Sequence, residues 1–189
     1  MLKTLFKTLL VEKEFMFTGL QRILVFSMLC TVPIVTVASA EQVQATILGN
    51  MDFEITDDAN LIPLNWIFEG PGYSGCCDSL VTFSGERSFR IDYTDVEPAD
   101  DYGLICRYIP FIFNEETITL SGWVRARNMR NDCHAGLYLI LYDRQGKLVS
   151  NEYVYLDNLN GSTEWSQLEV SMENSRFGYE LELGVFLYE

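Results

Sequence analysis

The stretch Thr117–Arg127, TITLSGWVRAR, alternates between two sets of side chains along its whole length. One set is Ile118, Leu120, Gly122, Val124 and Ala126, and the other is Thr119, Ser121, Trp123, Arg125 and Arg127. Successive side chains of an extended chain point to opposite faces, so this period of two predicts a strand with one face in a core.

The same alternation recurs in four other segments, and turn sequences separate them. The segments are residues 88–93, 136–143, 165–172 and 180–188, and the turns include Gly70-Pro71-Gly72, Ser84-Gly85, Arg144-Gln145-Gly146 and Asn160-Gly161. No helical period follows residue 41. About nine short strands at this spacing predict an all-β fold, an antiparallel β-sandwich or jelly roll.

Composition and charge exclude several classes of protein. The chain of 189 residues is 48% hydrophobic and 13% aromatic, which suits one packed domain and excludes a disordered one. Residues 41–189 hold nine basic and 25 acidic side chains. A body this acidic is repelled by phosphate backbones and anionic lipid surfaces, so we expect no nucleic-acid partner.

The N-terminal segment has the pattern of a leader. Arg22 precedes an uncharged apolar run, residues 23–37, and Ala38-Ser39-Ala40 follows before Glu41. This pattern predicts a secretory signal peptide, residues 1–40, cleaved after Ala40, with Met16 as an alternative start. A membrane anchor is the alternative, and Pro33 and the small residues favour cleavage. The mature domain, residues 41–189, is then secreted, periplasmic or on the cell surface, without membrane contact.

Export exposes four mature cysteines, Cys76, Cys77, Cys106 and Cys133, to an oxidising compartment, which predicts two disulfides. A bond between the neighbours Cys76 and Cys77 would close a strained ring. Each of them is therefore expected to pair with Cys106 or Cys133, in either combination. A metal site built from these thiols and His134 is the alternative, although the C-x-x-C pairs of zinc modules are missing.

Five motifs follow one another in an order typical of one family. They are Asn50-Met51-Asp52-Phe53-Glu54, then Pro63-Leu64-Asn65-Trp66, then residues 84–91 (SGERSFRI), then residues 118–125 (ITLSGWVR) and Gly161-Ser162-Thr163-Glu164-Trp165. In this series the chain resembles galactose-binding-like jelly-roll domains, which include many carbohydrate-binding modules. It is also similar to the non-catalytic domain that precedes some secreted bacterial tail-specific serine peptidases and esterase-like hydrolases.

The resemblance implies further features of the domain. Trp66 and Trp165 match positions that pack in the core. The family's last strand, which ends in an aromatic residue and Asp or Asn, has no counterpart before Glu189, so we expect a domain without its last strand. One expectation is a structural calcium ion at Glu54 and Asp52, with Asp57 and Asp58 as further oxygen ligands. The alternative is a solvated acidic edge.

No catalytic group of residues is apparent. The chain has neither G-x-S-x-G nor H-E-x-x-H, and His134 is its single histidine, so a nucleophile has no evident base. We therefore expect a protein that is not an enzyme.

The candidate ligand face consists of Trp123, Arg125 and Arg127 with Tyr138 and Tyr142, if their two strands are neighbours. Aromatic rings stack on the C–H faces of sugars, and arginine bridges adjacent hydroxyls. The alternative is that Trp123 packs and the arginines pair with acids. The sequence predicts an exported, non-catalytic binding module that binds a glycan or tethers a substrate. The alternative is an accessory domain of a secreted hydrolase that contacts protein and binds no sugar.

Overall fold

The computed structural model describes residues 48–56, 61–94, 102–113, 116–130, 133–156 and 160–188, together with the backbone of two N-terminal strands. Its strands are β1 (Lys13–Glu14), β2 (Ile23–Thr31), β3 (Ile67–Glu69), β4 (Tyr73–Asp78), β5 (Thr82–Phe83), β6 (Ser88–Tyr93), β7 (Tyr102–Pro110), β8 (Thr117–Arg127), β9 (His134–Tyr142), β10 (Leu148–Tyr155), β11 (Ser166–Glu173) and β12 (Glu180–Tyr188). Within these residues there is no helix, and hence none suited to crossing a bilayer. The predicted all-β class is confirmed.

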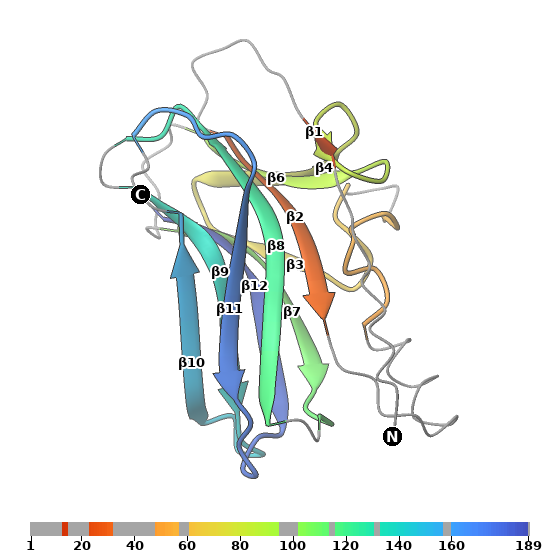
Figure 1. Cartoon of the computed structure of the whole chain (residues 1–189), viewed down its shortest axis with the longest axis vertical. Coiled ribbons are helices and arrows are strands. Elements are labelled where there is room, and N and C mark those ends of the chain that lie inside the picture. Colours follow the sequence, from red (N-terminus) through yellow and green to blue (C-terminus); the bar gives the residue numbers. More distant parts are fainter. Residues whose placement is uncertain are drawn as a thin grey trace, which may run out of the picture.

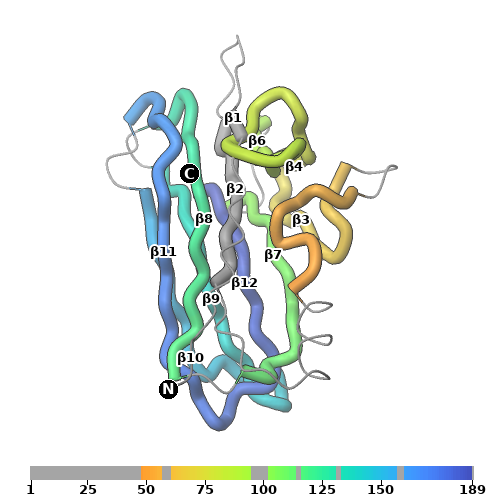
Figure 2. Tube along the Cα trace, turned by 45° about the vertical axis from the view of Figure 1, so that its right-hand side comes forward, coloured from red at the N-terminus to blue at the C-terminus, as the bar shows by residue number. Residues whose placement is uncertain are grey.

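The long strands form two sheets that lie face to face (Figures 1 and 2). The first, here called the β9 sheet, has the order β10-β9-β12-β7-β3. The second, the β8 sheet, has the order β11-β8-β2-β6-β4, and β1 pairs with β5 separately. Every pairing between neighbours is antiparallel. The topology therefore places β8 and β9 in different sheets, although they follow each other in the chain.

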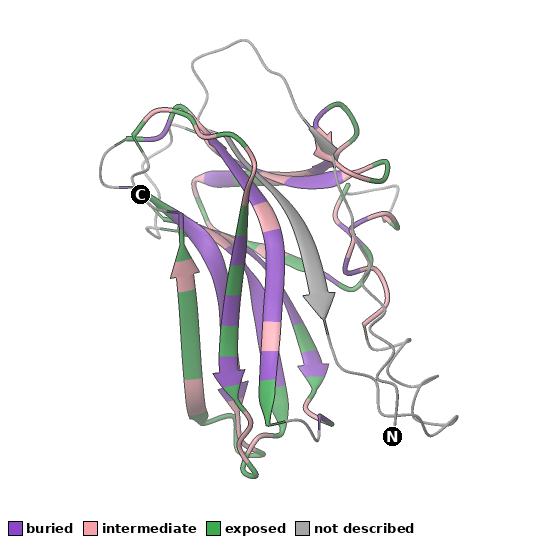
Figure 3. Ribbon diagram, in the orientation of Figure 1, coloured by how far each residue is buried: buried purple, intermediate pink, exposed green. Residues whose placement is uncertain are grey.

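The apolar sets predicted from alternation form one core between the sheets. Leu137, Leu139 and Leu141 of β9 and Val185 of β12 are fully buried and meet Val124 of β8. Burial changes with every residue along β11, while β10 is exposed over most of its length (Figure 3). The cores predicted for β8, β9 and β12 are thus confirmed.

The first two motifs of the sequence analysis meet in the structure. The Trp66 Nε1–H donates to the carbonyl of Asn50 at 2.9 Å, and the Trp66 ring meets the buried Phe53 ring edge-on at 4.8 Å. Glu54 Oε1 accepts the backbone N–H of Glu86 at 2.6 Å, which ties this corner to the turn before β6. The predicted core position of Trp66 is confirmed.

The N-terminal segment differs from the expectation that residues 1–40 lie outside the fold. Ile23–Thr31, the start of the predicted signal-peptide run, form β2 in the β8 sheet (Figure 1). β2 pairs with β8 on one side, with Phe26 opposite Val124, and with β6 on the other, with Phe26 opposite Phe89. It thereby joins two antiparallel pairs, β11-β8 and β6-β4, into one sheet. Cleavage after Ala40 stays a prediction.

The predicted disulfides are not present, because Cys76, Cys77, Cys106 and Cys133 are free thiols. Cys106 lies on the outer face of the β9 sheet, while Cys76 and Cys77 lie on β4 in the other sheet. The buried Cys77 Sγ instead approaches the carbonyl of Phe53 at 3.8 Å. The alternation of side chains in the sequence does not show in which sheet, or on which face of a sheet, each cysteine lies. The spacing of the cysteines therefore could not show that they are too far apart in the fold to pair.

The thiols give a direct chemical test of this arrangement. Burial raises the pKa of both the Cys77 and the Cys106 thiol to about 12, so at pH 8 almost no thiolate is present. We expect iodoacetamide at pH 8 to label these two cysteines slowly in the native protein. In guanidinium without reductant, Cys76, Cys77, Cys106 and Cys133 should each take up one label, beside the one on Cys30, as counted by the intact mass of the full chain. If the protein mass is instead lower by four hydrogens and these four cysteines take up no label, the two predicted disulfides are present.

Candidate functional site

The outer face of the β9 sheet carries an unusual number of aromatic side chains, and the strand register explains why they meet. On β9, Tyr138 stands opposite Tyr153 of β10 on one side and Gly184 of β12 on the other. Tyr188 of β12 stands opposite both His134 of β9 and Tyr102 of β7. Partners in register share a face, so the leucines of β9 and β12 face the core while these rings face outward.

These side chains enclose a hollow of about 490 Å³. We call it the tyrosine groove, and define it by its lining residues Tyr102, Leu104, His134, Tyr138, Ile140, Tyr153, Tyr155, Glu182, Phe186 and Tyr188. The lining comes from β7, β9, β10 and β12, so hydrogen-bonded strands hold every residue in place. It includes one carboxylate, one imidazole and no lysine or arginine.

The rings form a continuous array. Tyr153 is stacked with Tyr138 at 6.1 Å and with Tyr155 at 6.5 Å between centroids. Phe186 stands edge-on to Tyr153 at 6.2 Å and to Tyr155 at 5.4 Å. His134 continues the array, 5.5 Å from Tyr155. Parallel rings with a perpendicular one beside them make a shaped apolar wall rather than a flat patch.

Tyr138 can lie against the floor of the groove because its cross-strand partner is Gly184. A Cβ built on Gly184 would stand 2.3 Å from the carbonyl oxygen of Ile105 and 2.9 Å from Tyr138 Cε1. Both separations are too short for a side chain, so any larger residue would displace the ring. Tyr138 is 3% exposed, whereas Tyr153 and Tyr155 are 43% and 46% exposed. The groove thus has a buried floor and exposed walls.

A carboxylate lies beneath the rings. Glu182 is 6% exposed, and its two oxygens accept hydrogen bonds from the hydroxyls of Tyr138 and Tyr142, each at 2.8 Å. Burial raises the pKa of the Tyr138 and Tyr142 hydroxyls well above the ordinary tyrosine value, and the charge of Glu182 and its hydrogen bonds raise them further. Both phenols therefore stay protonated and donate to the carboxylate.

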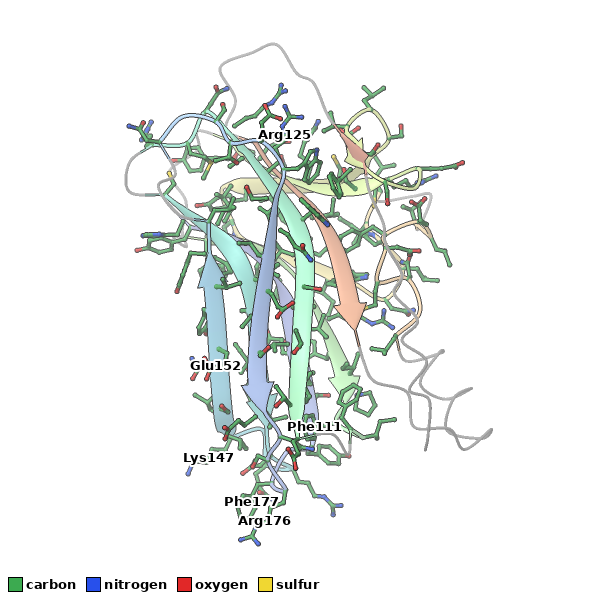
Figure 4. The ribbon with its side chains drawn as sticks, in the orientation of Figure 1. Phe111, Arg125, Lys147, Glu152, Arg176 and Phe177 are labelled. Atoms are coloured by element: carbon green, nitrogen blue, oxygen red, sulfur yellow. The ribbon has the colours of Figure 1, made fainter. Side chains whose placement is uncertain are left out.

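The structure separates the five residues predicted as one ligand face. Trp123, Arg125 and Arg127 lie on β8, while Tyr138 and Tyr142 lie on β9 in the other sheet. The half-buried Trp123 ring is stacked on Phe83 at 4.0 Å. Arg125 is buried, at one end of the molecule, 3.5 Å from the carboxylate of Glu164 (Figure 4). Of the five, only Tyr138 lines the tyrosine groove, and Tyr142 donates a hydrogen bond to Glu182 of its lining.

Sequence reasoning missed most of the groove. Glu182 and Phe186 lie in the alternating segment 180–188 but have no predicted role, and His134, considered as a possible metal ligand, begins β9. Tyr153 and Tyr155 were not singled out. The one signal in the sequence is that Tyr153 and Tyr155 lie two residues apart, in the segment after the predicted strand 136–143. Its meaning depends on register, which the sequence does not state.

At the expected calcium site, the Glu54 carboxylate accepts hydrogen bonds from the backbone. Glu54 Oε1 accepts backbone N–H groups from Glu86 and Arg87, and Asp52 Oδ1 lies 3.5 Å from the N–H of Glu54. Across the described residues, no three His, Cys, Asp or Glu side chains are grouped to hold a metal. Asp57 and Asp58 lie outside the described residues.

A second hollow, of about 890 Å³, lies at the end of the molecule opposite Arg125, where Figure 4 labels Lys147, Arg176 and Phe177. Its basic residues come from the turns between β9 and β10 and between β11 and β12. The Asp143 carboxylate there accepts backbone N–H groups of its own turn, and Arg176 lies over the ring of Phe177 at 4.9 Å. These contacts stabilise the turns themselves, so they give no evidence of a ligand site.

Comparison with known proteins adds little. No protein family and no curated protein matches the chain. Among solved structures, the chain is similar to the enzymatically active domain of tailspike protein 4 of bacteriophage CBA120, with 12% sequence identity and a TM-score of 0.49. The similarity covers 66% of this chain and 17% of that one.

The hydrogen bonds to Glu182 predict an alkaline loss of stability. The pKa of Tyr138 is raised in the folded state, so above pH 10 the unfolded chain releases this proton first and the free energy of unfolding falls. At pH 7, Tyr138→Phe should lower that free energy by about 1–3 kcal/mol, because it removes a donor from a buried carboxylate.

Urea unfolding of both proteins between pH 8 and 11 measures the effect. The decline above pH 10 should be shallower in Tyr138→Phe than in the unmodified protein. Tyr179→Phe, at an exposed tyrosine outside the groove, is the matched control and should follow the unmodified protein. Parallel curves for all three proteins would contradict the assignment of Tyr138.

Proposed function

We propose that this chain is an exported, non-catalytic binding module of the jelly-roll type, and that it binds carbohydrate in the tyrosine groove. The observation that carries the proposal is the groove itself, an aromatic hollow built on strands with a carboxylate at its floor. Its support is chemical, because a sugar has an apolar C–H face and polar edges, and the groove offers partners for both.

The exposed rings supply the stacking surfaces. Tyr102, Tyr153, Tyr155 and Tyr188 are each 40–46% exposed, so their faces are available to a ligand. They lie on strands spread across the sheet, from β10 to β7. Neighbouring strands are about 4.8 Å apart, so the groove spans about 14 Å, more than a single sugar ring needs. An oligosaccharide chain is the ligand that uses this width.

Polar groups at the floor and rim supply the hydrogen bonds. The Glu182 carboxylate lines the groove, the tyrosine hydroxyls can both donate and accept, and His134 lies exposed at one end. Because the backbone pairing holds these groups, little ordering is required when a ligand binds. This rigidity favours the groove over the turns of the second hollow.

The alternative function is the accessory domain of a secreted hydrolase, which contacts protein and binds no sugar. The exposed tyrosines also suit such a contact, because aromatic residues are enriched at protein interfaces. The two functions differ in one observable, the binding of free oligosaccharides to the isolated protein. Glycan-array screening of the protein therefore separates them.

Substitutions on the two sheets test the site. Tyr153→Ala and Tyr155→Ala should each weaken binding of the best array oligosaccharide by about ten- to a hundredfold, the effect of losing a ring worth 1–3 kcal/mol. Both residues are exposed, so melting temperatures should change little. Calorimetric titration measures the affinities.

Two control variants accompany them. Tyr179→Ala removes an equally exposed tyrosine outside the groove and should leave affinity unchanged. Trp123→Ala, on the β8 sheet, should lower stability, because its ring is stacked on Phe83, and should also leave affinity unchanged. Loss of binding in Trp123→Ala alone would move the site to the other sheet, as the sequence predicted.

A further inference from the structure

The tyrosine groove combines two features that point to the charge of its ligand. Its lining contains a carboxylate but no lysine or arginine. Two more carboxylates lie on the same outer face, since Glu180 precedes Glu182 on β12 and Glu69 of β3 stands opposite Leu104, while the basic residues near Glu180 line the second hollow. A ligand in the groove therefore meets negative charge without a positive counterpart.

Glu182 has neutral hydrogen-bond partners. Its oxygens accept from the phenols of Tyr138 and Tyr142, and the ion pairs seen within the described residues do not include it. Desolvated charge is usually compensated in proteins by an opposite charge. Here the compensation comes from phenol groups, which include that of Tyr108 on β7, and the carboxylate borders a hollow wide enough for a ligand.

The exposed rings further along the groove also favour positive charge. The face of an aromatic ring carries negative potential and attracts a cation within about 6 Å of its centroid. Tyr153 and Tyr155 are parallel, with 17° between their planes, and Phe186 closes the space beside them at about a right angle. Three rings in this arrangement form walls suited to an ammonium group, four residues along β12 from Glu182.

We propose that the tyrosine groove selects glycans with free amino groups, with the protonated amine directed toward Glu182 and the sugar rings stacked on the exposed tyrosines. This inference rests on the proposed carbohydrate-binding function and names its substrate class. Uronic acids and sulfated sugars are disfavoured, because their charge has the same sign as Glu182. The excess of acidic side chains in residues 41–189 further attracts a polycationic chain and speeds the encounter.

The test uses three β-1,4-linked oligosaccharides of equal length, made of glucosamine, N-acetylglucosamine or glucose. They share one backbone geometry and differ in the substituent at C2, which is an ammonium, a neutral amide or a hydroxyl. The glucosamine oligomer should bind to the full chain at least tenfold more tightly than the other two in calorimetric titration. Its advantage should shrink as salt is raised from 50 to 500 mM, because charge supplies the difference.

Substitution of the carboxylate assigns the preference to one residue. Glu182→Gln keeps the shape of the side chain and removes its charge, so the glucosamine oligomer should fall to the affinity of the glucose oligomer. Glu180→Gln, the matched control, removes an exposed carboxylate from the same face of β12 but outside the groove lining, and should keep the preference. Thermal melts of both variants verify folding. The comparison of three sugars on the unmodified protein needs no variant.

Other binding results would contradict either the amino-sugar inference, the proposed function or the location of the site. Equal affinity for all three oligomers would overturn the amino-sugar inference and leave carbohydrate binding in place. Failure to bind these three oligomers and every other glycan on the array would overturn the proposed function itself, whereas binding only to a glycan without amino groups would overturn the amino-sugar inference alone. If Tyr153→Ala and Tyr155→Ala bound the glucosamine oligomer as well as the unmodified protein, the attraction would be a general effect of the acidic surface, and the groove would not be the site.

Discussion

The alternation of β9 and β12 is the constraint on which both the core and the groove depend. Each strand places leucine or valine toward the β8 sheet and a tyrosine, phenylalanine or glutamate outward. A slip of one residue would bury Glu182 in the core and expose Leu181 and Leu183, so the register is strongly determined. The packing between the sheets therefore positions the ligand groups as firmly as it positions the leucines.

Within that register, Gly184 and Glu182 shape the groove together. The absence of a side chain at Gly184 lets Tyr138 lie against the strand, and the hydroxyl then reaches the carboxylate of Glu182. Tyr142 reaches the same carboxylate from four residues further along β9, with Ile140 between the two tyrosines on the outward face. The floor of the groove is thus fixed by hydrogen bonds, while the walls stay exposed. A fixed floor keeps the charge of Glu182 in one place.

Sequence patterns predicted the strands and their inner faces well, because a period of two depends on local geometry alone. They failed where long-range pairing decides. Trp123 and Tyr138 were assigned to one face since their strands are consecutive, yet β8 and β9 belong to different sheets. Cys106 was expected to form a disulfide, but the register turns it to the outer face of β7. The apolar run that includes Ile23–Thr31 fits a leader, and it fits equally a strand between two neighbours, because both require uninterrupted apolar residues.

The distribution of aromatic residues separates the molecule into two spectroscopic regions. All three tryptophans lie away from the tyrosine groove, with Trp66 in the core against Phe53, and Trp123 and Trp165 beside Phe83. The aromatic residues of the groove lining are tyrosines, one phenylalanine and one histidine. Emission from tryptophan therefore reports on the core and the β8 sheet, whereas the groove contributes to the near-ultraviolet dichroism through its stacked tyrosines, alongside the Tyr73–Tyr93 pair of the β8 sheet. One sample can thus show a ligand entering one face while the other serves as an internal reference.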